Sequence, residues 1–244
     1  MPAFRKPVPD KRGEKHLSRV SLELVILRVE AEQLQIWLEP KAGPSAGAEK
    51  WKLPGSLISP APSLDAEARR KLKHRKLKQG SGSRRLYMEQ LYTFARRPLR
   101  RSPSTIAVTY LVLVGPEAGI GGERGRWFLP AKLPALSPGT AETVGYALER
   151  LRNKIQYTPA VFHLLPPQFS LSELQMTYER ILGRSLDKRN FRKKFLSLNI
   201  LISNGQTASG RGRRPARLYS HLAGRGTRAG AGREKSFLLS FASA

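Results

Sequence analysis

The strongest chemical pattern in this 244-residue chain is a short segment rich in cationic and amide side chains, L-D-K-R-N-F-R-K-K-F-L at 186–196. On a helix, Phe191, Phe195 and Leu198 fall on one face, and the basic side chains occupy much of the rest. Arginine and asparagine make bidentate hydrogen bonds with guanine and adenine, and lysine pairs with phosphates. We therefore predict a DNA-contacting helix with Asn190 on adenine, Arg189 or Arg192 on guanine, Lys193 and Lys194 on phosphates, and Lys188 on the same cationic face. The alternative is an amphipathic helix whose basic face is only solvated.

A second cationic pattern, G-R-G-R-R-P-A-R at 210–217, separates arginines by glycines. Such arginines can lie flat in a narrow minor groove, where the negative potential is concentrated. We predict that Arg211, Arg213 and Arg214 contact DNA in this way. An unstructured cationic loop is the alternative.

The composition agrees with a polyanionic partner and excludes several other chemistries. There are 44 Lys and Arg residues against 18 Asp and Glu, a net charge of +26. The absence of cysteine excludes disulfides, cysteine zinc sites and thiol nucleophiles. The four histidines are scattered, with no H-E-x-x-H pair, so we expect neither a metal site nor a cofactor. No export signal or membrane-spanning segment is recognisable, and we expect a cytoplasmic protein.

The elements that position these residues fall into two groups. Residues 20–29 and 34–38 are rich in branched side chains and predict a β-hairpin, and 86–94 and 105–114 predict further strands. Between them, 65–78 consists of good helix formers, while 115–125 is a glycine-rich loop. This order of elements is typical of an α/β (α+β) sandwich.

The C-terminal part changes to short helices. Residues 140–156 place apolar side chains on one helical face, and helical signals follow at 160–165, 170–182 and 186–198. Ser170 or Ser172 can cap the helix at 170–182, and Glu173 stands three residues after Ser170, as in a capping box. Gly183 is suited to end that helix, and Asp187 or Ser185 to begin the next. Two short strands at 200–203 and 217–221 would then form a β-wing. The outline is a winged helix-turn-helix.

Several of these segments together resemble the C-terminal half of the Nudix-related transcriptional regulators. The resemblance rests on Y-T-P at 157–159, F-S-L-S-E-L-Q at 169–175, L-D-K-R-N-F-R-K-K at 186–194 and R-P-A-R-L-Y at 214–219. W-K-L-P-G at 51–55 and E-Q-L-Y-T-F at 89–94 resemble the strands that flank the Nudix box of this family. The resemblance implies a Nudix-fold sensor domain joined to a winged helix, and a homodimer that binds a palindromic operator in double-stranded DNA.

The Nudix box itself departs from the family of active enzymes. A working box has the form G-x5-E-x7-R-E-U-x-E-E, whose glutamates bind divalent cations. Here Pro62 takes the place of the first glutamate, and Lys71, His74 and Arg75 take the places of the other three. Because Mg²⁺ requires hard oxygen ligands, we predict that this helix has no metal, no catalytic residues and no hydrolase activity.

The same substitutions suggest a different use for the helix. Arg70, Lys71 and Arg75 are predicted to bind a phosphorylated metabolite, with fixed positive charge in place of a metal. The alternatives are a solvated surface or a further contact with DNA phosphates.

The resulting prediction is a DNA-binding transcriptional regulator with a non-catalytic Nudix-like domain, and the resemblance to the family implies that it is a repressor. We divide the chain into a basic arm at 1–17, a Nudix-like domain at 18–156, a winged helix-turn-helix at 157–222 and a flexible tail at 223–244. Two other hypotheses remain open. One is a Nudix pyrophosphohydrolase with a relocated metal site at Asp65, Glu67 and Glu89, and the other is a general nucleic-acid-binding protein.

Overall fold

The structure, a computed structural model, describes residues 19–41, 50–58, 63–78, 86–96, 105–120, 125–208 and 215–222. The predicted arm at 1–17, the tail at 223–244 and the wing arginines Arg211, Arg213 and Arg214 lie outside these residues. Among the described helices, none is both long enough and apolar enough to span a membrane.

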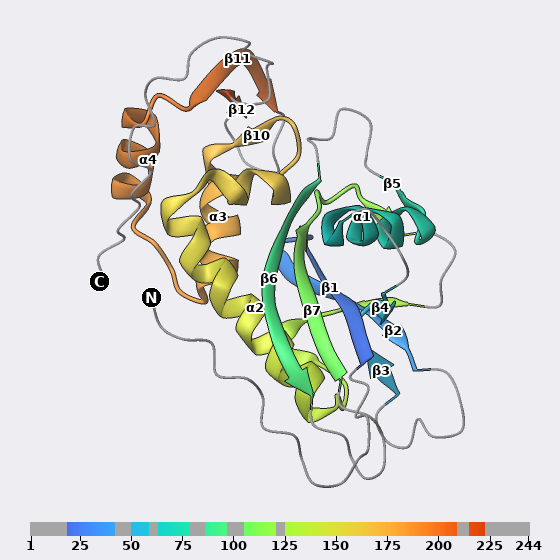
Figure 1. Cartoon of the computed structure of the whole chain (residues 1–244). Helices are drawn as coiled ribbons and strands as arrows, with labels where there is room; N and C mark the ends of the chain where they lie inside the picture. Colours follow the sequence, from blue (N-terminus) through green and yellow to red (C-terminus); the bar gives the residue numbers. More distant parts are fainter. Residues whose placement is uncertain are drawn as a thin grey trace, which may run out of the picture.

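The N-terminal part is built on a mixed sheet with the strand order β3-β2-β1-β7-β6 (Figure 1). The predicted hairpin is confirmed: β1 (Arg19–Glu30) pairs antiparallel with β2 (Gln33–Pro40), and Ala31 and Glu32 both have positive φ angles in the tight turn. The sheet is completed by β7 (Thr105–Leu113), which runs parallel to β1, and by β6 (Tyr87–Arg96), β3 (Trp51–Lys52), β4 (Gly55–Leu57) and β9 (Arg126–Phe128).

Both faces of this sheet are buried, which explains the nearly continuous apolar sequence of β1. Leu22, Leu24 and Ile26 pack in one cluster with Ala68 and Leu72 of α1 (Leu64–His74). The alternate residues of β1 pack in a second cluster with α2 (Pro138–Tyr157). The predicted α/β sandwich is therefore confirmed, with α1 on one face of the sheet and α2 on the other.

Helix α1 is shorter than the predicted helix at 65–78. It ends at His74, with Arg75 as its C-cap, and Lys76 then adopts a positive φ of 49°. The chain continues as β5 (Leu77–Lys78), which pairs antiparallel with β8 (Gly119–Ile120) inside the segment predicted to be a loop. Good helix propensity at 75–78 is thus overridden by tertiary contacts, which hold Arg75 and pair the two short strands.

The C-terminal part has the predicted winged helix-turn-helix arrangement. A 3₁₀ segment at Pro159–Leu164 precedes β10 (Phe169–Ser170), α3 (Leu171–Leu182), α4 (Lys188–Ser197), β11 (Leu201–Ala208) and β12 (Ala216–His221). The capping box of Ser170 and Glu173 is present, Gly183 ends α3 with a φ of 73°, and Asp187 caps α4. Strands β10, β12 and β11 form the sheet that carries the wing.

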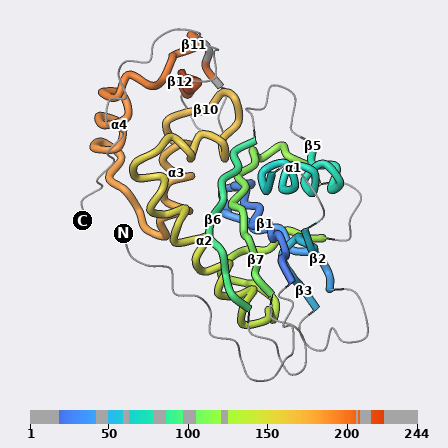
Figure 2. Tube along the Cα trace, in the orientation of Figure 1, coloured from blue at the N-terminus to red at the C-terminus, as the bar shows by residue number. Residues whose placement is uncertain are grey.

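Helix α2 connects the two parts of the chain. In Figure 2 it lies between the central sheet and α3. One hydrophobic cluster contains Val25 of the sheet, Leu151 of α2 and Leu174 of α3. The Tyr178 hydroxyl donates to the Ile155 carbonyl at 3.1 Å, and Arg152 Nε donates to the Ile181 carbonyl at 3.1 Å. The winged helix is therefore packed directly on the helix that covers the sheet.

Candidate nucleic-acid interface and ligand site

The orientation of α4 is fixed by two buried phenyl rings. Phe191 and Phe195 are 1% and 0% exposed, and their ring centroids lie 5.6 and 5.4 Å from that of Tyr178 in α3. At the start of the helix, Asp187 Oδ1 accepts a hydrogen bond from the Asn190 amide at 2.7 Å. Five of the six predicted DNA-contacting side chains on α4 are consequently exposed to solvent: Lys188, Arg189, Asn190, Arg192 and Lys193.

Lys194 differs from these five because it is only partly exposed. Burial lowers the pKa of its ammonium group. Its predicted contact with a phosphate stays a prediction, as do the base contacts of the other residues.

Two polar side chains of α3 form hydrogen bonds with the turn between α3 and α4, and the sequence analysis did not predict these contacts. Glu179 Oε1 accepts from the Leu186 amide at 2.8 Å and from Gln175 Nε2 at 3.0 Å. Gln175 Nε2 also donates to the Leu186 carbonyl at 2.9 Å. The spacing of Gln175 and Glu179 by four residues is the signal that these side chains meet on one helix face. They hold Leu186, the residue before the N-cap of α4, to α3.

A hollow of about 580 Å³ lies between α4, the start of α3 and the wing. Its lining includes the cations Lys188 and Arg192 from α4 and Arg217 from β12, with Ser170 and Ser172 from the start of α3. Arg217 was not among the residues predicted to contact DNA. The structure thus brings helix and wing cations to one concave surface, which suits a phosphate backbone.

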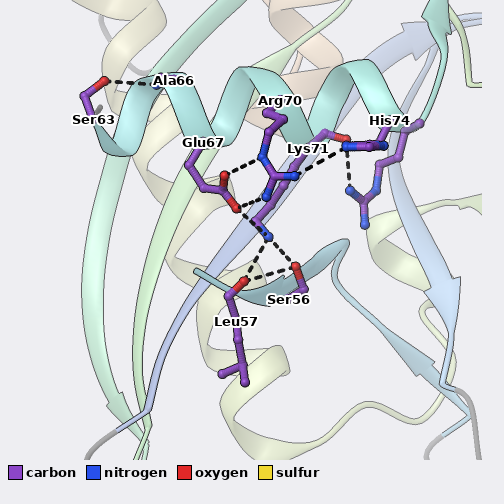
Figure 3. A network of polar contacts seen from close by, with 9 residues as sticks. Ser56, Leu57, Ser63, Ala66, Glu67, Arg70, Lys71 and His74 are labelled. Atoms are coloured by element: carbon purple, nitrogen blue, oxygen red, sulfur yellow. Dashed lines mark hydrogen bonds and ion pairs between the residues drawn. The ribbon is translucent and has the colours of Figure 1, made fainter. Parts of the chain in front are cut away.

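On α1, two of the three basic side chains predicted to bind a metabolite, Arg70 and Lys71, pair with a buried carboxylate (Figure 3). Glu67 is fully buried and accepts hydrogen bonds from Arg70 Nε at 2.7 Å and from Arg70 Nη2 at 2.9 Å. Lys71 Nζ lies 3.0 Å from the same carboxylate. The hydrogen bond from Arg70, supported by Lys71 and opposed by burial, lowers the pKa of Glu67 to about 2. Glu67 is therefore ionised and engaged at both oxygens.

Arg75 pairs with a different carboxylate, that of Glu39 on β2. Its Nε and Nη2 atoms donate to the two oxygens of Glu39 at 2.5 and 3.0 Å, and its Nη1 donates to the Lys71 carbonyl at 3.0 Å. Arg75 is 8% exposed and Glu39 is 6% exposed. This bidentate pair ties the end of α1 to the central sheet.

The structure thus gives Arg70, Lys71 and Arg75 partners within the protein. Lys71 and Arg75 are also buried, and only Arg70 is exposed among the three. Binding of a metabolite by these residues stays a prediction. For Lys71 and Arg75 it would require a ligand to displace existing ion pairs.

The hypothesis of a relocated metal site at Asp65, Glu67 and Glu89 is wrong, because the structure does not bring these three carboxylates together. Asp65 accepts a hydrogen bond from the Tyr110 hydroxyl at 2.6 Å on the α1 side of the sheet. Glu89 lies 2.5 Å from Lys154 Nζ of α2, and α2 covers the opposite face. Within the described residues, no group of three or more His, Asp or Glu side chains is arranged to hold a metal ion.

A divalent cation, which the Nudix fold implies, does not fit the residues that stand here. The box helix offers an ammonium, an imidazole and a guanidinium where the enzyme pattern has carboxylates, and its one buried carboxylate, Glu67, is already paired with two cations. No reaction step can be built on a metal bound at this helix.

Comparison with known proteins matches both parts of the chain. Residues 161–221 match the family model of the NrtR DNA-binding winged helix domain. Over 208 residues the chain is 30% identical to the ADPR responsive transcriptional repressor NtrR of Acinetobacter baylyi, covering 82% of this chain and 80% of the relative. The chain belongs to the NrtR family of transcriptional regulators.

The solved structures agree with this membership. The crystal structure of NrtR from Shewanella oneidensis complexed with a 27mer DNA has a TM-score of 0.69 and 25% identity, and covers 83% of this chain and 93% of its own. A MutT/nudix family protein from Enterococcus faecalis has the same fold, with a TM-score of 0.66 and 20% identity over 86% of this chain and 90% of its own. The protein is thus a DNA-binding regulator in which a Nudix domain is joined to a winged helix.

Proposed function

We propose that this NrtR-type regulator is a repressor that binds an operator through α4 and the wing, and releases it when ADP-ribose binds the Nudix domain. DNA binding is supported above all by helix α4, which is anchored by two buried rings and has five exposed cationic and amide side chains. These side chains lie inside the matched winged-helix region. The name of the Acinetobacter baylyi relative supports both ADP-ribose as the effector and repression as the outcome. We place its action in the cytoplasm.

Sequence readout is assigned to the exposed polar residues at the start of α4. Asn190, Arg189 and Arg192 contact base edges in the major groove, and Lys188 and Lys193 contact phosphates. Arg217 at the hollow beside α4 adds a phosphate contact from the wing. The Shewanella oneidensis relative in complex with DNA supports this mode of binding.

The Nudix domain is assigned a sensing role without hydrolysis. Hydrolysis of a pyrophosphate by this fold needs metal ions held by carboxylates, and the box helix has cations at those positions. Glu67 is engaged by Arg70 and Lys71, which leaves it unable to serve as a metal ligand or a general base without breaking two ion pairs. ADP-ribose is thus bound as a signal and not turned over.

Signal transfer is assigned to α2, because this helix packs on the sheet and on α3 at once. It has 20 residues and spans about 30 Å. In a homodimer on a palindromic operator, two copies of α4 must enter major grooves about one helical turn apart. A ligand that favours another separation of the two winged helices would release the DNA by shifting the population of dimer conformations.

The test is footprinting of the full-length protein on the DNA upstream of its own operon, with and without ADP-ribose. We expect a protected, two-fold symmetric site and loss of protection on addition of ADP-ribose. Protection without sequence preference would refute specific regulation and favour the general nucleic-acid-binding hypothesis. Protection unaffected by ADP-ribose would refute the assigned effector alone.

A further inference from the structure

The side chain of Lys71 is unusual because it is a buried cation at a position where the active Nudix pattern has a metal-binding glutamate. Lys71 is 4% exposed, although it lies on a helix whose neighbouring cations Arg69 and Lys73 are exposed. Burying an ammonium group is unfavourable unless its charge and its hydrogen bonds are compensated. The surroundings of Nζ therefore explain why lysine is tolerated here.

Three oxygens of different chemical type surround the ammonium group (Figure 3). Nζ lies 3.0 Å from Glu67 Oε1 and donates to the Leu57 carbonyl at 3.3 Å and to the Ser56 hydroxyl. An ammonium has three N–H donors, so each can be matched by one of these oxygens. A carboxylate, a carbonyl and a hydroxyl are also the hard oxygen ligands that Mg²⁺ and Ca²⁺ take in proteins.

These contacts join two elements that are far apart in sequence. Ser56 and Leu57 belong to β4, which pairs with the first residues of β1, while Glu67 and Lys71 belong to α1. In a metal-dependent site, a bound divalent cation can bridge a helix and a neighbouring loop in this manner. Here a cation attached covalently to the helix makes the bridge.

We propose that the Lys71 ammonium is a built-in cation that occupies an oxygen-lined site between α1 and β4 and makes the Nudix domain independent of divalent metal. The charge of Glu67 is balanced by Lys71 on one side and by Arg70 on the other. Because lysine cannot dissociate, this site stays filled at any concentration of free Mg²⁺. Applied to ligand sensing, the inference rests on the proposed function, but its test uses stability alone and is independent of DNA and ADP-ribose.

The first test replaces the cation by the carboxylate of the enzyme pattern, Lys71→Glu, with Lys73→Glu as the control. The control makes the same charge change at an exposed position of the same helix. Thermal unfolding of the full chain is measured in EDTA, in MgCl₂ and in MnCl₂. We expect the wild type and Lys73→Glu to unfold at the same temperature in all three buffers.

Lys71→Glu places a second carboxylate beside Glu67, and like charges at such a distance cannot both stay ionised without a cation. We expect its Tm to fall in EDTA and to rise by about 5–10 °C when the metal concentration is about 100-fold above its Kd. Binding of Mn²⁺ to this variant should be visible by electron paramagnetic resonance. A folded Lys71→Glu that ignores metal, or a wild type that is stabilised by metal to the same extent, would overturn the proposal.

A second pair of variants decides the matter if Lys71→Glu does not fold in any buffer. Lys71→Met keeps the length of the side chain but removes the charge, and Lys73→Met is its exposed control. We expect Lys71→Met to lower the Tm by about 5 °C or more relative to Lys73→Met, because one partner of a buried ion pair is lost. Equal Tm values for the two methionine variants would overturn the proposal that Lys71 is a built-in cation.

Discussion

Removal of the Arg75 guanidinium should destabilise the protein strongly, because it leaves the Glu39 carboxylate buried without its partner. Arg75→Met deletes two hydrogen bonds to Glu39, at 2.5 and 3.0 Å, and one to the Lys71 carbonyl at 3.0 Å. Both partners are less than a tenth exposed. Breaking a buried, hydrogen-bonded ion pair from one side costs about 3–5 kcal/mol.

For a chain of this size, 1 kcal/mol corresponds to a change in Tm of about 2–4 °C, so we expect Arg75→Met to lower the Tm by about 6–20 °C. The assay is thermal unfolding followed by circular dichroism, with urea unfolding to obtain the change in free energy. Arg69→Met is the matched control, since Arg69 is exposed on the same helix. It should change the free energy of unfolding by less than about 0.5 kcal/mol.

A double-mutant cycle separates the ion pair from simple loss of packing. Glu39→Leu combined with Arg75→Met removes both charges, and we expect the double variant to be more stable than Arg75→Met alone, because no uncompensated charge remains in the interior. The reasoning would be refuted if Arg75→Met were as stable as Arg69→Met. That result would mean that the guanidinium is free for a ligand, as the sequence had suggested.

Three further predictions concern acid stability, the anchoring of α4 and DNA readout. The pKa of Glu67 is about 2 in the folded state against an ordinary value of 4.5. The stabilisation that the ionised carboxylate provides is therefore present above pH 4.5 and is lost as the pH falls from there toward 2. Urea midpoints measured across this range should fall less steeply for Glu67→Gln than for the wild type. Phe195→Ala should cost about 3–5 kcal/mol and weaken DNA binding, since this ring on the inner face of α4 is fully buried against α3. Leu196→Ala removes an exposed side chain of the same helix and should leave the free energy of unfolding nearly unchanged. Asn190→Ala should weaken binding to the operator by about 1–3 kcal/mol with little effect on binding to random DNA. Lys193→Ala should weaken binding to both DNAs and reduce the slope of log K against log salt concentration by about one. Fluorescence anisotropy at several salt concentrations distinguishes the two variants, and equal losses for Asn190→Ala on both DNAs would contradict base readout.

The winged helix was predictable from the sequence because its signals are local. The capping box of Ser170 and Glu173, the left-handed Gly183 and the N-cap Asp187 each act within a few residues. Gly183 ends α3 as predicted, and of the alternatives that the sequence offered, Ser170 and Asp187 are the N-caps. The pairing of Phe191 and Phe195 on one face follows from helical periodicity alone. Local patterns of this kind also located the hairpin of β1 and β2.

The partners of the box helix were not predictable, because they come from distant parts of the chain. Arg75 meets Glu39 across 36 positions, and Lys71 meets Ser56 and Leu57 across 15 and 14 positions. The sequence of the segment does not indicate which of its cations are buried. Arg69 and Lys73 are exposed, although they are the same residue types as the buried Arg75 and Lys71. The end of α1 was missed for the same reason, because the β5–β8 pairing is also a long-range contact.

The most direct test of metal-independent sensing by a DNA-binding regulator is the anisotropy of labelled operator DNA bound to the full-length protein, titrated with ADP-ribose in EDTA and in MgCl₂. We predict that ADP-ribose releases the DNA at the same concentration in both buffers, and that the ADP-ribose is recovered intact without formation of AMP. Release that requires Mg²⁺, or conversion of ADP-ribose to AMP during the titration, would contradict a sensor whose cations are its own lysine and arginine side chains.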